Sequence, residues 1–222
     1  MCEMKSMQGM TRELNTEEAI KNIARICNLE LDEIPHCDTI NDVFEKVKVE
    51  EIEKIRKYMI TKLIRGKIIQ KYKIRDRYYH VIVDGTGLAT SRKKYNENCL
   101  VKNKTDKNGN EYQEYSTYVL EAKLVVGEMV FSIGSEFVEN ADENTTKQDC
   151  EINAFKRLAE KIKKEYPKLK ILISGDALYA CKAVFDICKE NGWKYIIRFK
   201  EGAIPSLYNE FETVVAKENE ST

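Results

Sequence analysis

The chain has 222 residues, of which 42% are hydrophobic and 33% are charged, and its 37 Lys and Arg side chains balance 37 Asp and Glu. This length is sufficient for one full domain and a smaller one around a sizeable core. The charge balance excludes a simple polycation that coats nucleic acid. No run of the sequence approaches the roughly 18 apolar residues of a membrane span.

The cysteines and histidines argue against a zinc site and against export. Seven cysteines include no C-x-x-C pair, and two histidines are available to complete a site. The odd number of cysteines, and a start without a signal-peptide pattern, fit reduced thiols. We therefore expect a cytoplasmic protein.

Residues 1–75 are expected to form a small helical domain. Asn15 and Thr16 form a cap signal before apolar residues at helical spacing, which predicts a helix to about residue 28. After Pro35, Asp38 or Thr39 can cap a short helix, and a longer helix should run over 49–66. Acidic residues outnumber basic ones by 13 to 7 over residues 1–55, whereas residues 60–80 contain 7 basic residues and one acidic residue.

From residue 76 the hydrophobic period changes from helical to strand-like. Strands are predicted over 78–83, 115–126 and 129–138, the last two as an antiparallel hairpin, with a long polar loop over 91–114. A helix over 147–165, a strand over 169–174, a helix over 179–190, a strand over 193–199 and a helix over 205–217 should follow. This order predicts a mixed five-stranded sheet flanked by helices, by the right-handed crossover rule.

Two of the apolar runs end on an aspartate. Val81-Ile82-Val83 is followed by Asp84-Gly85-Thr86-Gly87, and Ile171-Leu172-Ile173 is followed by Ser174-Gly175-Asp176. If the first and fourth strands are neighbours, the two carboxylates share one site and repel each other unless a cation neutralises them. The alternative is that each Asp only caps the turn that follows, and that Gly-Thr-Gly is a plain turn.

These segments together resemble insertion-sequence transposases of the DDE class, which have a ribonuclease H-like catalytic domain. The resemblance covers most of the chain and rests on four segments: residues 81–87, 147–151, 175–180 and 197–202. It implies a ribonuclease H-like catalytic domain over 76–222, preceded by the helical domain 1–75, which in this class helps to recognise the ends of the element.

The resemblance matches Asp84 and Asp176 with the first two acids of the catalytic triad, which hold two divalent metal ions. It implies metal-dependent DNA cleavage and strand transfer. Carboxylate oxygens suit Mg²⁺, with Mn²⁺ as a substitute. The implied partner is double-stranded DNA, at the transposon ends and the target, and a homodimer on DNA is compatible with it.

The third acid of the triad has no counterpart here, because in this class it lies beyond a further strand-rich insertion and the chain stops at Thr222. The catalytic domain is therefore expected to be incomplete at its C-terminus. Glu210 and Glu212 are expected to face solvent, opposite a buried apolar stripe. Asp149 and Glu151 could approach the metals, as a carboxylate does in ribonuclease H, or could simply favour the start of their helix.

Basic residues in the long loop are candidates for contacts with DNA. A mobile basic loop beside an acidic metal site could hold the duplex across it. The candidates are Arg92, Lys93, Lys94, Lys102 and Lys104.

Three other interpretations compete with a working transposase. A haloacid-dehalogenase-type phosphatase would need a nucleophile where this chain has Ile82 and an acid where it has Ala180, which argues against it. A catalytically inactive DNA-binding remnant of a transposase and a ribonuclease H-fold nuclease that uses Asp149 or Glu151 both stay open.

Overall fold

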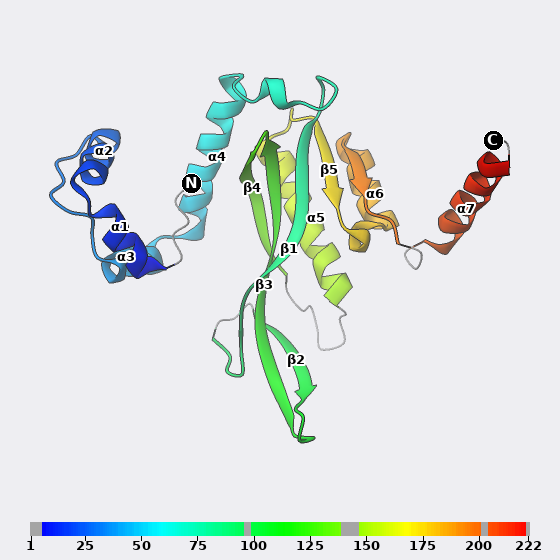
Figure 1. Cartoon of the computed structure of the whole chain (residues 1–222), viewed down its shortest axis with the longest axis horizontal. Helices are drawn as coiled ribbons and strands as arrows, with labels where there is room; N and C mark the ends of the chain where they lie inside the picture. The colour runs from blue at the N-terminus through cyan, green and yellow to red at the C-terminus, as the bar shows by residue number, and fades with distance from the viewer. Residues whose placement is uncertain (1–5, 96–98, 139–146, 201–203, 221–222) are drawn as a thin grey trace. The chain divides into compact units, whose positions relative to one another are not determined.

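The structure is a computed structural model that describes residues 6–95, 99–138, 147–200 and 204–220. Its contacts divide the chain into two compact units, Met1–Ile55 and Arg56–Thr222 (Figure 1). The division falls within α4 (Val49–Arg65), because Ile60 in the second half of this helix is buried in the core of the second unit. No helix among the described residues is long and apolar enough to cross a membrane.

The first unit contains α1 (Met7–Leu14), α2 (Glu17–Cys27), α3 (Cys37–Lys46) and the start of α4. The predicted cap of α2 is confirmed, because the Thr16 hydroxyl accepts a hydrogen bond from Ala19 N at 3.3 Å. The cap of α3 differs from the prediction: the His36 ring, rather than Asp38 or Thr39, accepts from Asp38 N. α1, which Ser6 caps, was not predicted from the sequence.

The second unit is built on a mixed sheet of six strands (Figure 1). The strands are β1 (Tyr79–Ser91), β2 (Leu100–Thr105), β3 (Glu111–Val126), β4 (Met129–Val138), β5 (Ile171–Gly175) and β6 (Lys194–Ile197). β3 lies antiparallel to β1, β2 and β4, whereas β1, β5 and β6 run parallel. The order β4-β3-β1-β5-β6 is the expected ribonuclease H-like arrangement, so the fold class is confirmed, with six strands instead of five.

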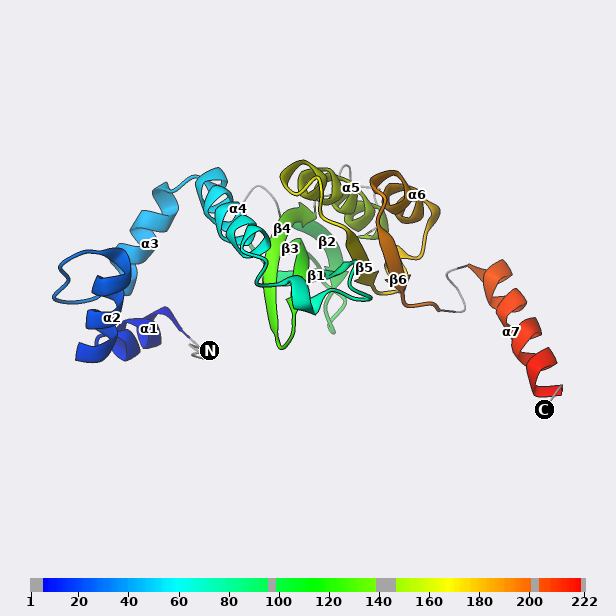
Figure 2. The ribbon, with the colours of Figure 1, turned by 90° about the horizontal axis from the view of Figure 1, so that it is seen from above.

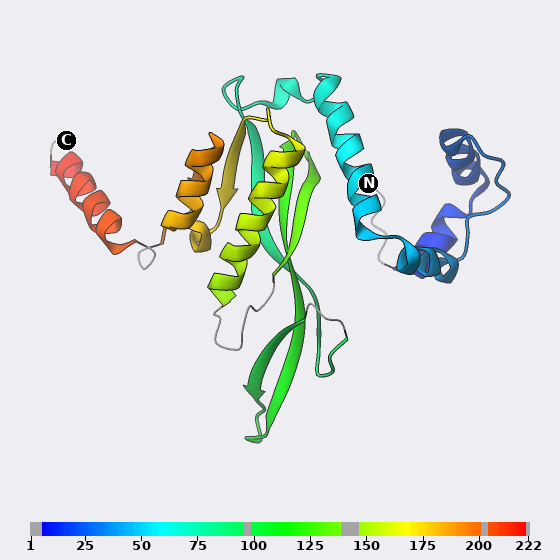
Figure 3. The ribbon, with the colours of Figure 1, turned by 180° about the vertical axis from the view of Figure 1, so that it is seen from behind.

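One face of this sheet is covered by helices, as Figures 2 and 3 show. α5 (Lys147–Glu165) packs against β3 and β4, and α6 (Lys182–Asn191) packs beside it. The remaining elements are the short helices η1 (Gln70–Tyr72) and η2 (Ala177–Tyr179), and α7 (Pro205–Glu220).

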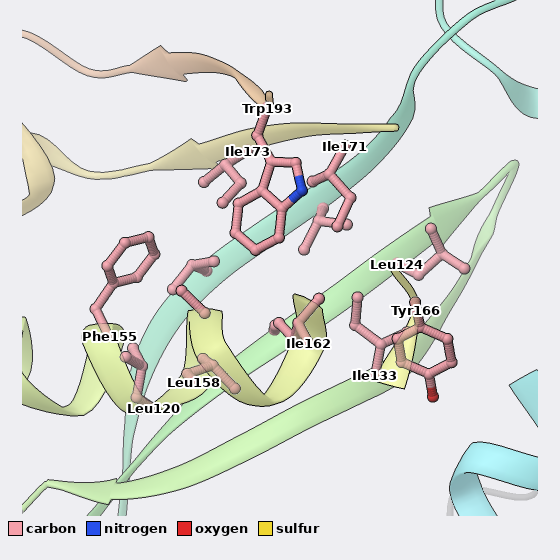
Figure 4. Packing of buried hydrophobic residues seen from close by; sticks show 14 of the residues in the cluster. Leu120, Leu124, Ile133, Phe155, Leu158, Ile162, Tyr166, Ile171, Ile173 and Trp193 are labelled. Atoms are coloured by element: carbon pink, nitrogen blue, oxygen red, sulfur yellow. The ribbon is translucent and has the colours of Figure 1, made fainter. Parts of the chain in front are cut away.

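The core lies between α5 and the sheet (Figure 4). Strand alternation turns Leu120 and Leu124 of β3 toward α5, which contributes Phe155, Leu158 and Ile162. Gly134 of β4 allows α5 to approach closely, because a Cβ added there would lie 2.8 Å from a methyl carbon of Leu158. Ile171, Ile173 and Trp193 extend the same core.

The predicted loop over 91–114 is wrong, because it contains β2 and the start of β3. These strands form a two-stranded ribbon, with Leu100 paired to Ser116 and Thr105 paired to Glu111. The ribbon turns at Asp106, whose carboxylate accepts hydrogen bonds from Asn108 N and Asn110 N. Because most of β2 is exposed, its sequence lacks the alternation that marks a half-buried strand.

The packing of α5 can be tested with a buried and an exposed apolar side chain. We expect Leu158→Ala to lower the free energy of unfolding by about 2–5 kcal/mol, because it removes a core side chain and leaves a cavity. Val130→Ala on β4 is the control, since Val130 is 53% exposed. Urea denaturation measures both, and equal effects of the two substitutions would contradict this core.

Candidate active site at Asp84 and Asp176

The register between β1 and β5 places Asp84 and Asp176 at the same level. The two strands are parallel, and their last registered pair is Ile82 with Ser174, two residues before each aspartate. Gly175 lies beside Val83, because a Cβ added at Gly175 would lie 3.5 Å from the Val83 carbonyl oxygen. Since neighbouring strands are about 4.8 Å apart, the two exposed acids follow adjacent points of the sheet.

The two acids differ in how the chain continues after them. β5 ends at Gly175, so Asp176 follows a strand end as predicted. The same prediction for Asp84 is wrong, because β1 runs on to Ser91 and pairs Asp84 with Glu121 of β3. The suggested Gly-Thr-Gly turn is also wrong: Gly85 and Gly87 are strand residues opposite larger side chains of β3.

Asp176 does act as a cap, as the alternative interpretation suggested. Its Oδ1 accepts a hydrogen bond from Leu178 N at 2.9 Å, which begins η2. This bond uses one lone pair of a carboxylate that offers about four. Capping and metal binding are therefore compatible at this residue.

Glu151 of α5 is a third carboxylate in this region, next to Gly85 of β1. It is 6% exposed, and it is the one charged residue in the buried class among the described residues. Its Cδ lies 3.7 Å from a Cβ added at Gly85, so it approaches β1 immediately beyond Asp84. A role limited to favouring the helix start would not require this burial. The side chain of Asp149 lies outside the described residues.

Tyr179 connects the three carboxylates electrostatically. Burial raises the pKa of its phenol, and the negative charges of Glu151, Asp176 and Asp84 raise it further, in decreasing order. The hydroxyl therefore stays protonated and keeps its ability to donate a hydrogen bond. Tyr179 was not predicted as a site residue, because it lies in a largely apolar segment and was expected to start a helix.

A second connection between β1 and β5 lies on the face opposite α5. His80 Nε2 is 2.7 Å from Ser174 Oγ, and burial lowers the pKa of this histidine, which favours its neutral form. This hydrogen bond fixes the two strands close to the acids. This hydrogen bond was not predicted, because the two residues are 94 positions apart and nothing in the sequence near either one indicates the pairing.

The donor set fits a hard divalent cation. Carboxylates are the protein ligands that Mg²⁺ and Mn²⁺ prefer, and a buried phenol without a partner can support them. Among the described residues, one group of three has all its ligand atoms within 4.8 Å, namely His36, Cys37 and Asp38 in the first unit. Asp84, Asp176 and Glu151 are not such a group as their side chains stand, so they would hold ions only after their side chains move closer together.

Two of the predicted DNA contacts are already engaged within the ribbon. Lys104 Nζ lies 2.6 Å from Glu114 Oε1, and the Arg92 guanidinium lies 4.6 Å from the centre of the Tyr112 ring. Lys93, Lys94 and Lys102 are exposed. The ribbon brings Arg92, Lys102 and Lys104 to one arm, and their contact with DNA stays a prediction.

α7 departs from the predicted burial. Phe211 and Val214 of its apolar stripe are 61% and 51% exposed, so the expectation of a buried stripe is wrong in this chain. Glu210 and Glu212 are exposed, as expected.

Comparison with known proteins found solved structures only. No family model and no curated protein matched. The similar structures include the catalytic domain of Mos1 mariner transposase, with 12% identity over 77% of this chain and 72% of that chain, at a TM-score of 0.32. They also include the Mos1 transposase paired-end complex with left transposon end, with 10% identity over 90% of this chain, and the Mos1 mariner paired end complex with Mn, with 14% identity over 97%. Both have TM-scores of 0.32, and this chain spans 59% and 62% of their lengths.

All three are transposases, the class that the sequence resembles. At these TM-scores we base the fold on the strand order and the site on its own geometry.

Two substitutions at Asp176 can distinguish the contribution of its capping hydrogen bond from that of its negative charge. We expect Asp176→Asn to change the free energy of unfolding by less than about 0.5 kcal/mol, because Asn caps as well as Asp. Asp176→Ala should cost about 1 kcal/mol. Denaturation without divalent ions measures both, and an equal loss in the two variants would contradict the capping bond.

Proposed function

We propose that this chain is a DDE-type transposase that cleaves DNA and transfers the cut strand in a metal-dependent reaction. The observation that carries this proposal is the parallel register of β1 and β5, which brings Asp84 and Asp176 to one level, one residue before the contact of Glu151 with Gly85. Double-stranded DNA is the proposed partner, at the element ends and at the target. The cytoplasm is the proposed location, and a homodimer on DNA is compatible with this function.

Asp84, Asp176 and Glu151 are the residues that would hold the ions. Bound Mg²⁺, or Mn²⁺ in its place, would activate a water or a DNA 3′-hydroxyl and stabilise the leaving oxygen. The cap from Leu178 N orients the Asp176 carboxylate. Glu151 contacts β1 at Gly85, the residue that follows Asp84.

The first unit and the ribbon are proposed to bind the duplex. The first unit would contribute to recognition of the element ends, as the resemblance implies. The exposed Lys93, Lys94 and Lys102 would contact phosphates without reading sequence. Arg92 and Lys104 would add to this surface by exchanging Tyr112 and Glu114 for phosphate oxygens.

A second candidate, a ribonuclease H-fold nuclease, is favoured by the burial of Glu151. A nuclease would use Glu151 for hydrolysis alone and would not join a 3′-hydroxyl to a second DNA. Incubation of nicked element ends with a target plasmid separates the two candidates, because joined products appear with a transposase and only hydrolysis products with a nuclease.

Replacement of either aspartate tests the site. We expect Asp84→Asn and Asp176→Asn to reduce Mn²⁺-dependent strand cleavage by at least about 10³-fold, because each removes an anionic metal ligand. DNA affinity in a gel-shift assay should stay within about threefold. Cleavage at the wild-type rate in either variant would refute the assignment, and wild-type binding without cleavage would favour an inactive remnant.

The exposed lysines are tested by the salt dependence of DNA binding. Each lost phosphate contact lowers the slope of log K against log salt by about 0.9. We therefore expect Lys93→Ala, Lys94→Ala and Lys102→Ala together to reduce the slope by about 2–3. Alanine at the exposed Lys164, Lys168 and Lys170, before β5, is the control with the same charge change. Equal slopes in the two triple variants would mean that Lys93, Lys94 and Lys102 do not belong to the DNA-binding surface.

A further inference from the structure

Tyr179, the last residue of η2, has a buried hydroxyl without a partner. Its side chain is 2% exposed, and no hydrogen bond to the hydroxyl exists among the described residues. An unpaired buried hydroxyl lowers stability, and such groups are rare in folded proteins. A residue of this kind beside a candidate active site therefore requires an explanation.

The ring of Tyr179 is held in place by its neighbours. A Cβ added at Gly175 would lie 2.9 Å from the ring carbon Cδ2, so the glycine provides the space that the ring fills. The Phe155 ring of α5 packs on it, with the ring centres 5.8 Å apart. Because the ring is confined on both sides, the direction of the hydroxyl is fixed before any ligand binds.

The groups that act electrostatically on the hydroxyl are three carboxylates, which are hydrogen-bond acceptors. Glu151 lies one turn before Phe155 on the same side of α5, and it also raises the pKa of Tyr179 more than Asp176 and Asp84 do. A carboxylate has two oxygens, so one can accept from the phenol while the other binds an ion. Glu151 is the buried member of the three.

We propose that Tyr179 is a positioning residue whose hydroxyl donates a hydrogen bond to the Glu151 carboxylate when that carboxylate binds a divalent cation. This inference rests on the proposed function of the site. Partners of this kind orient metal ligands, and their removal costs about 10–100-fold in metal affinity. The hydroxyl is then paired when the site holds a cation, and it is unpaired, at a cost in stability, when the site is empty.

Tyr166 provides a matched control for Tyr179. Its hydroxyl is also buried without a hydrogen-bond partner, and its side chain is 6% exposed. It follows the C-terminal end of α5, 15 residues from Glu151, a distance of about 22 Å along a helix. Tyr→Phe at each position therefore removes the same group, once beside the carboxylates and once far from them.

The experiment compares the full chain with its Tyr179→Phe and Tyr166→Phe variants, using thermal unfolding without divalent ions and calorimetric titration with MnCl₂. Both variants should keep the wild-type Tm or raise it by roughly 2–4 °C, because each loses an unpaired buried hydroxyl. Only Tyr179→Phe should weaken Mn²⁺ binding, by about 10-fold or more, and Tyr166→Phe should stay within about twofold.

Each other outcome overturns a defined part of this interpretation. Equal Mn²⁺ affinity in Tyr179→Phe and the wild type overturns the role of Tyr179 and leaves the metal site intact. A lower Tm of Tyr179→Phe without ions overturns it as well, because the hydroxyl would then stabilise the empty fold. Wild-type Mn²⁺ binding that is absent, or that Asp176→Asn does not change, overturns the proposed function itself.

Discussion

The parallel pairing of β1 with β5 is the constraint on which the candidate site depends. Because the strands run in the same direction, Asp84 and Asp176, which each follow the registered pair of Ile82 and Ser174 by two residues, lie at the same level of the sheet. Val81 and Ile173, a registered pair in the core, fix this register, since a slip of one residue would turn them to the other face. The packing of the core thus determines where the carboxylates meet.

The site opposes the stability of the domain that carries it. A buried phenol without a partner lies near three carboxylates, and both the unpaired phenol and the proximity of like charges oppose folding in the absence of a ligand. The apolar layer between α5 and the sheet offsets this cost (Figure 4). Conflicts of this kind between local chemistry and stability concentrate at functional sites.

The distribution of charge over the chain matters more for binding than its neutral total. The ribbon of β2 and β3 carries lysines together with acidic partners, so part of its positive charge is neutralised within the arm. Exposed ion pairs of this type contribute little to stability and exchange easily for other partners. A chain without net charge can therefore still present a local surface for phosphates.

The sequence by itself determined the elements whose signals are local. α5 and β4 were predicted with the observed bounds, because their hydrophobic periods end at clear breaks, and β3 was predicted short at its start. The two aspartates were found from the apolar runs before them. Only the tertiary structure decided the continuation of β1 beyond Asp84, the ribbon strand β2, the burial of Glu151 and the position of Tyr179. Each of these depends on a partner distant in sequence, and pairing and burial across such distances leave no periodic trace in the chain.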